Sequence, residues 1–189
     1  MTATRNEMIT TALRPPEVRS IPGMRRALAV VVAGAAALLT AGCTVPSGAV
    51  VGIGVDAKGN PVGYLQVCHD HIVGATIYID DAHTFGSWTT SPAAAGYTTW
   101  SLADPSSPWK ADDPLHKRKA RTTYAMYGWT NDNSSSAEAV EFTVEDLAAM
   151  KPGQVRYDAG KTTSDGMNGL YSVTSEDQFR QTVCKRYTS

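Results

Sequence analysis

The segment from Val67 to Asp81 carries the side chains that are best suited to chemistry in this sequence. It reads VCHDHIVGATIYIDD and places Cys68, His69 and His71 close together, and His83 follows two residues after its end. Thiolate, imidazole and carboxylate groups are the usual protein ligands of zinc, and a zinc site takes three or four of them. The segment therefore raises the hypothesis of a metal site at His69 and His71. Asp80, Asp81 and His83 would complete the site if the chain folded back.

A plainer interpretation is that the same residues end a β-strand. Side chains alternate between the two faces of a strand, so Cys68 and Asp70 would point one way while His69 and His71 point the other. If Cys68 forms a disulfide and faces the interior, the two histidines face solvent. We prefer this interpretation, and it predicts no resident metal or other cofactor.

Motifs typical of enzymes are missing from the sequence. It has no G-x-S-x-G elbow, no S-x-x-K, no H-E-x-x-H and no phosphate-binding glycine loop. Asp112 and Asp113 are adjacent, but they lie in a proline-rich segment that is unsuited to holding side chains rigidly for acid-base catalysis. A binding protein is therefore favoured, and the alternative is a metal-binding protein or metal-dependent enzyme that uses His69 and His71.

The N-terminal region has the layout of an export signal. MRRALAVVVAGAAALLTAGC, from Met24 to Cys43, gives two arginines, an apolar run and then small residues. The run is shorter than the about 20 residues needed to cross a bilayer. The preceding residues 1–23 include two glutamates and a proline pair, unlike a short basic leader, so we expect translation to start at Met24.

The end of this signal, LTAGC, resembles the lipobox of bacterial lipoprotein precursors. The resemblance implies that cleavage follows Gly42 and that Cys43 carries a diacylglyceryl thioether. It divides the chain into a signal peptide (1–42), a lipidated tether (43–48) and a folded domain (49–189). The protein would then be held at the outer face of the bacterial cytoplasmic membrane. An ordinary cleaved signal, which would leave Cys43 as a free thiol, is the alternative.

Charge and cysteine content support an exported domain. Five of the 17 basic residues and two of the 18 acidic ones lie in the first 42 positions, so the rest has a net charge of about −4. Such a surface does not recruit nucleic acid by electrostatics. Outside the cytoplasm an even pair of cysteines indicates a disulfide, so Cys68 and Cys184 are predicted to be bonded.

Short apolar and β-branched runs separated by turn residues predict a mainly β domain, an antiparallel β-sandwich. Thr143 is placed to cap a short helical turn that Pro152 and Gly153 end, and Ser175 to start a short C-terminal helix. The order of these elements resembles a corner of immunoglobulin-like sandwiches. A strand is followed by a helical turn, a Pro-Gly pair and a second strand that contains Tyr157. The predicted strands are 49–57, 62–68, 74–80, 86–90, 96–102, 121–130, 137–144 and 154–159.

Several segments together resemble a group of secreted lipoproteins of Streptomyces-like actinobacteria. They are the lipobox, GVDAKGNPVGYLQVC, YGWTNDNSSSAEAVEFTVEDLAAMKPGQVRYD and FRQTVC. The resemblance spans nearly the whole mature chain and implies location and domain extent, without implying chemistry. We therefore expect a binding module for a cell-envelope protein or glycan. Trp109, in the predicted surface loop 103–120, is the expected ligand contact because exposed aromatic rings stack on sugars or anchor protein partners.

Overall fold

The computed structural model describes residues 45–79, 83–160 and 171–187. The predicted signal peptide, Cys43, Asp80 and Asp81 lie outside the described residues. Residues from Val45 onward belong to one compact unit of the chain. Among the described residues, no helix has the length and apolar character needed to span a membrane.

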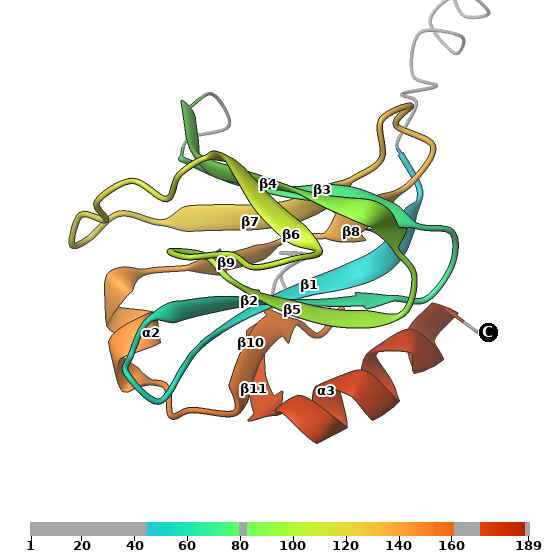
Figure 1. Cartoon of the computed structure of the whole chain (residues 1–189). Helices are drawn as coiled ribbons and strands as arrows, with labels where there is room; N and C mark the ends of the chain where they lie inside the picture. The colour runs from blue at the N-terminus through green and yellow to red at the C-terminus, as the bar shows by residue number, and fades with distance from the viewer. Residues whose placement is uncertain (1–44, 80–82, 161–170, 188–189) are drawn as a thin grey trace, which may run out of the picture. The chain divides into compact units, whose positions relative to one another are not determined.

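The described residues are mainly β, as the sequence predicted (Figure 1). Short helices α2 (Val144–Ala149) and α3 (Glu176–Thr182) are accompanied by the 3-10 helix η1 (Val183–Tyr187). The strands are β1 (Ser47–Val55), β2 (Pro61–Val67), β3 (Ile72–Ile79), β4 (His83–Ala94), β5 (Tyr97–Ser101), β6 (Trp109–Asp113), β7 (Tyr124–Trp129), β8 (Ser136–Glu138), β9 (Val140–Phe142), β10 (Gln154–Asp158) and β11 (Tyr171–Ser175).

Strand β1 is the central element of the sheet. It pairs with β2 along most of its length, and its other edge is shared by β8 near Ser47 and by β10 at Gly52 and Ile53. Every residue of β1 after Ser47 is buried. A strand that is buried on both faces is expected to be a continuous apolar run, as AVVGIGV is.

All eleven strands of the described residues belong to one mixed sheet, which is nearly barrel-shaped. The β1–β8 pair is parallel and joins the half that contains β3, β4, β6 and β7 to the half that contains β1, β2, β5, β10 and β11. In Figure 1 these halves lie as an upper and a lower layer. The mainly β prediction is thus confirmed, whereas the antiparallel immunoglobulin-like sandwich is not, because a parallel pair connects the layers.

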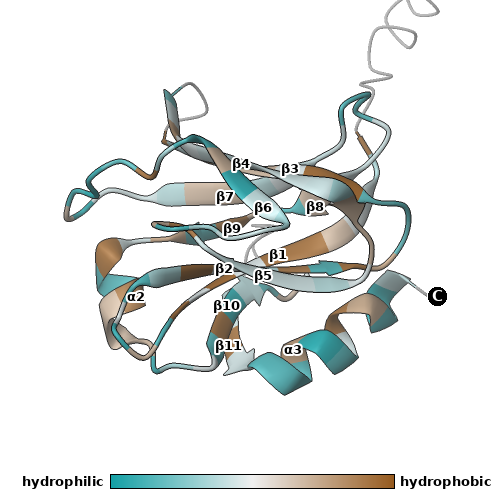
Figure 2. Ribbon diagram, in the orientation of Figure 1, coloured by the Kyte–Doolittle hydropathy of each residue, from teal (hydrophilic) through white to brown (hydrophobic). Residues whose placement is uncertain are grey.

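The main core fills the space between the two halves of the sheet. Its largest fully buried side chains include Trp88, Tyr124, Phe142 and Met126. Figure 2 shows the apolar colouring concentrated on inner strands such as β1. Full burial of one such side chain contributes about 1.5–3 kcal/mol to stability.

A second, smaller core lies under α3. Phe179 and Val183 of the C-terminal helices pack against Val50, Tyr64 and Val155. Because these helical residues are four positions apart, they share one face of the helix. The predicted C-terminal helix is confirmed, and its apolar face covers the outer side of β1, β2 and β10.

Both predicted helix starts have the expected caps. The Thr143 side chain accepts a hydrogen bond from the Asp146 backbone N–H, and the Asp146 carboxylate accepts one from the Thr143 backbone N–H. At α3 the Ser175 hydroxyl accepts a hydrogen bond from the backbone N–H of Gln178. These bonds satisfy backbone donors that the first turn of a helix leaves without partners.

Candidate functional site

The predicted disulfide is present and closes one end of the domain. Cys68 is bonded to Cys184, with Cα atoms 5.3 Å apart and a sequence separation of 116. The backbone N–H groups of Cys68 and His69 both donate to the carbonyl oxygen of Gly48 in β1. The bond therefore ties η1 to the end of the sheet where β1 begins.

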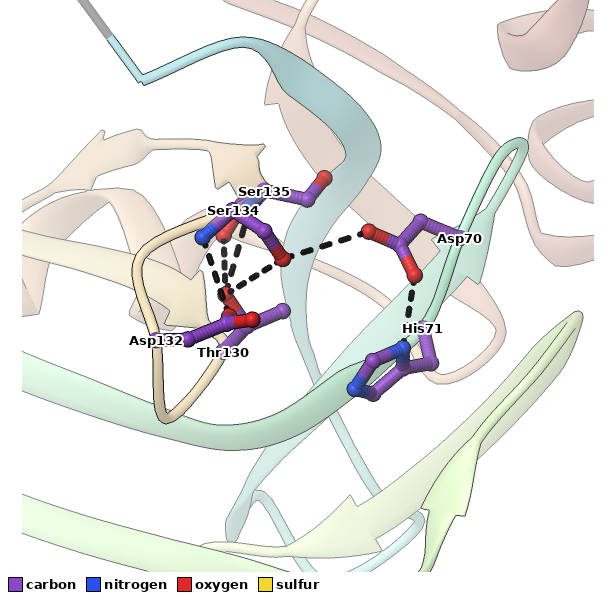
Figure 3. Close-up of polar contacts among 6 residues, drawn as sticks. All are labelled: Asp70, His71, Thr130, Asp132, Ser134 and Ser135. Atoms are coloured by element: carbon purple, nitrogen blue, oxygen red, sulfur yellow. Dashed lines mark hydrogen bonds and ion pairs between the residues drawn. The ribbon is translucent and has the colours of Figure 1, made fainter.

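The residues after Cys68 form a polar cluster with the β7–β8 turn (Figure 3). Asp70 adopts a φ of 64°, which ends the alternation of side chains along the strand. The Asp70 carboxylate lies 2.6 Å from Nδ1 of His71 through one oxygen, and its other oxygen accepts a hydrogen bond of 3.4 Å from the Ser134 hydroxyl. The cluster thus links the β2–β3 connection to the β7–β8 turn.

The β7–β8 turn is organised around Asp132 and Thr130. The Asp132 carboxylate accepts a hydrogen bond of 3.0 Å from the Ser134 backbone N–H. Hydrogen bonds from the backbone and side chain of Ser134, and then from Thr130, lower the pKa of Asp132 to about 2. The buried Thr130 hydroxyl donates to the carbonyl oxygen of Ser135 at 3.0 Å. These contacts fix the position from which Ser134 reaches Asp70.

The cluster does not have the geometry of a nucleophilic triad. A serine nucleophile needs a hydrogen bond to the histidine that removes its proton, and the carboxylate belongs on the far side of that histidine. Here Ser134 contacts Asp70 instead of His71, as Figure 3 shows. The His71 and Asp70 side chains are also 44% and 40% exposed, so their contact is screened by solvent.

The structure does not bring together the three histidines of the metal-site hypothesis, His69, His71 and His83. His69 Nε2 lies 3.2 Å from the carbonyl oxygen of Tyr187 in η1, whereas His71 contacts Asp70. His83 pairs with Ile79 at the far end of β3, which is eight residues and about 26 Å along the chain from His71. Among residues 45–79, 83–160 and 171–187 no group of three or more metal-ligating side chains comes together.

Trp109 is a core residue, so its prediction as an exposed ligand contact is wrong. Its side chain is 2% exposed, and its ring stacks on Trp100 with centroids 4.1 Å apart. Its indole Nε1–H donates to the hydroxyl of Thr98 at 3.1 Å. The segment predicted as a surface loop contains strand β6, which pairs with β4 and brings Trp109 opposite Thr90.

Two surface grooves are candidates for binding. The first, named the α2 groove, has a volume of about 410 Å³. It is lined by Glu145, Asp146, Ala149, Met150, Gln154, Arg156 and Val173. Arg156 is held by two contacts: its Nε–H donates to the carbonyl oxygen of Glu141 at 2.8 Å, and its guanidinium lies 3.6 Å from the Asp146 carboxylate. Val173 on β11 is 49% exposed beside it.

The second groove, named the α3 groove, lies between α3 and the β2–β5 pair. It has a volume of about 310 Å³ and is lined by Gln66, Tyr97, Asp177, Arg180 and Gln181. The sequence interpretation missed both grooves, because each combines side chains from segments far apart in the chain. Only the pairing of β2 with β5 and of β10 with β11 brings them together.

No protein-family model matches the chain, and no curated protein or solved structure is significantly similar to it.

Proposed function

We propose that this protein is a lipid-anchored module at the outer face of the cytoplasmic membrane that binds a cell-envelope protein through its α2 groove. The lipobox-like LTAGC sequence supports an anchor at Cys43. The Cys68–Cys184 disulfide supports an exported domain, since such bonds persist in oxidising compartments.

The link between the anchor and the domain is short. Strand β1 begins at Ser47, inside the segment predicted as tether, and the Pro46 carbonyl oxygen already accepts a hydrogen bond from the Ser136 backbone N–H. Three residue steps separate Cys43 from Pro46, a reach of about 10 Å. A lipid on Cys43 would therefore keep the start of β1 at the membrane surface.

The α2 groove is the observation that carries the proposed binding role. Its residue Arg156 pairs with Ile53 of β1, which lies about 20 Å along the strand from Ser47. The groove is therefore separated from the anchored end of β1, and a partner protein can reach it when the domain is attached to the membrane. Val173 and Met150 offer apolar surface, and protein interfaces combine such a centre with a polar rim.

Charge indicates the kind of partner segment that fits. Glu145 and Asp146 outnumber Arg156 in the lining of the groove, and Arg156 is already neutralised by Asp146. The exposed Glu145 carboxylate therefore favours a segment with a basic side chain next to an apolar one. Electrostatic complementarity of this kind contributes specificity and association rate.

The anchor is tested by mass spectrometry of the protein extracted from membranes. We expect the mature chain to begin at an acylated Cys43, and Cys43→Ser to leave the unprocessed precursor. An unmodified mature terminus in the soluble fraction would overturn the anchored role.

The groove is tested by placing a photo-crosslinking amino acid at Val173 in intact cells. We expect a discrete protein adduct that Glu145→Lys abolishes, because the added lysine repels a basic segment. The control position is Thr99, an exposed residue of β5. Adducts that are equal at both positions, or unaffected by Glu145→Lys, would contradict the groove as the binding surface.

A metal-binding role is the second candidate, and one contact favours it. The Asp70 carboxylate lies at hydrogen-bond distance from His71 Nδ1, an arrangement that commonly orients a metal-ligating histidine and leaves its Nε2 available. Elemental analysis of the purified protein tests this role. Stoichiometric zinc or copper that is lost in His71→Ala would support it, and a metal-free protein would exclude it.

A further inference from the structure

Every side chain that lines the α3 groove carries a polar group. Its side chains supply two amides (Gln66 and Gln181), one carboxylate (Asp177), one guanidinium (Arg180) and one phenol ring (Tyr97). Together they offer both hydrogen-bond donors and acceptors around one hollow. Its volume of about 310 Å³ falls at the lower end of the range of small-molecule sites.

Two of the lining side chains are held in place before any ligand arrives. The Tyr97 hydroxyl donates to the Glu176 carboxylate at 2.8 Å. The Arg180 guanidinium carbon lies 4.6 Å from the centre of the Tyr97 ring, a cation–π contact. No ion pair to Arg180 occurs within the described part of the chain, so its N–H groups remain available to a ligand.

The Gln66 side chain is held by a hydrogen bond to its own strand, β2. Its Nε2–H donates to the neighbouring Val67 carbonyl oxygen at 3.2 Å, which leaves the side-chain carbonyl oxygen as an acceptor. Gln66 also pairs with Tyr97 across β2 and β5, so the two side chains share a face of the sheet. The N–H groups of Arg180 and the side-chain carbonyl oxygen of Gln66 therefore both line the α3 groove.

The lining excludes several classes of ligand. It contains no aliphatic residue, so a long acyl chain would find only the Tyr97 ring and short methylene stems to pack against, while the polar groups around them would lose hydration. Asp177 offsets the charge of Arg180, which disfavours a phosphate or another strong anion. A neutral ligand that is rich in hydroxyl groups satisfies all five side chains, since each hydroxyl both donates and accepts.

We propose that the α3 groove binds a saccharide unit, either of a soluble envelope glycan or of a glycolipid headgroup. This inference adds a ligand class to the anchored binding role proposed above and rests on a different surface. Gln66, which lines the groove, pairs with Val50 of β1. Val50 lies about 10 Å along the strand from Ser47. A short link at Cys43 would therefore hold it within reach of headgroups as well as of soluble glycans.

The test uses the full mature protein in detergent micelles and follows ligand binding by saturation-transfer NMR and calorimetry. The soluble probes are chitotetraose, maltotetraose and mannotetraose. Vesicles of phosphatidylcholine with and without diglucosyl diacylglycerol, titrated with the protein, distinguish a headgroup from a soluble source. We expect the protein to bind saturably either to one of the soluble oligosaccharides or to the vesicles that contain the glycolipid.

Matched variants locate the binding. Gln66→Ala and Arg180→Ala should each weaken it about fivefold, the effect of losing one hydrogen bond worth about 1 kcal/mol. Lys58→Ala, at an exposed position of the β1–β2 turn that lines neither groove, is the control and should leave saccharide binding unchanged. Failure of every saccharide to bind saturably, or equal binding by the Gln66→Ala/Arg180→Ala double variant, would overturn the inference. An acylated Cys43 together with a Val173 adduct would still support the function proposed above.

Discussion

Trp100 lies directly over Gly63 on the neighbouring strand. The two residues are opposite each other in the β2–β5 pair, and a methyl group at Gly63 would come within 2.6 Å of Trp100 Cε2. Gly74 and Trp129 repeat the arrangement in the β3–β7 pair, where the corresponding distance to Trp129 Cε2 is 2.7 Å. Glycine within a strand often marks such a close approach. These glycines therefore make room for indole rings that a larger residue would displace.

Gly63→Ala is expected to destabilise the domain by about 1–3 kcal/mol, because the indole of Trp100 must move out of a packed core. In a domain of this size each kcal/mol lowers Tm by about 2–4 °C, which thermal unfolding followed by near-ultraviolet circular dichroism would detect. In a Trp100→Leu background the same substitution should cost less, since the clashing ring is gone. An equal cost in both backgrounds would contradict the proposed contact.

Local signals in the sequence predicted most of the strands and both helices. The Thr143 cap and the apolar face of Phe179 and Val183 depend on neighbours in the chain, so they could be recognised without the fold. The parallel β1–β8 pair could not be predicted in this way, because the alternation of side chains along a strand does not specify which strand lies beside it. This is why the mainly β class was predicted correctly and the arrangement of the sheet was not.

Removing the Cys68–Cys184 bond is expected to destabilise the domain by about 2–5 kcal/mol, because a loop of over a hundred residues is no longer closed in the unfolded chain. The double variant Cys68→Ser/Cys184→Ser should show this loss in chemical denaturation. Amide exchange should increase most in α3 and η1, which the bond ties to the start of β1. If amide exchange increased equally in β1 and β3, the bond would support the whole domain and not the C-terminal segment in particular.

Thr143→Ala should lower stability by about 0.5–2 kcal/mol, since the side chain that caps α2 is lost. Thr143→Ser keeps the hydroxyl and should restore most of this stability. Chemical denaturation of both variants provides the comparison. If the serine variant is as unstable as the alanine variant, the cap is not the cause, and packing of the threonine methyl group is.

The candidate sites were harder to predict than the fold. Trp109 sits beside a proline in a charged segment, and that composition indicated a loop, but pairing with β4 and stacking on Trp100 bury it. His83 follows the CHDH segment closely in sequence, yet strand β3 carries it to the opposite end of the sheet. Proximity in sequence therefore predicted a histidine cluster that the course of the strand prevents.

Asp132 should titrate with a pKa of about 2, below the ordinary value of 3.8. Because the folded-state pKa is lowered, the hydrogen bonds to its carboxylate favour the folded turn fully above the ordinary value, and that contribution is lost as the pH falls toward 2. The carboxyl carbon resonance of Asp132, followed by NMR through acid titration, measures the midpoint. A midpoint at or above 3.8 would contradict the hydrogen bonding of the turn.

Ser134→Ala separates the two contributions of Ser134 to that pKa. The variant loses the hydroxyl but keeps the backbone N–H that donates to Asp132 at 3.0 Å, which is the larger cause of the shift. The midpoint should therefore rise while staying below 3.8. The same substitution removes the hydroxyl that donates to Asp70, so the resonances of the Asp70 and His71 side chains should move as well. A change confined to Asp132 would show that the β7–β8 turn and the Asp70–His71 pair are not connected through Ser134.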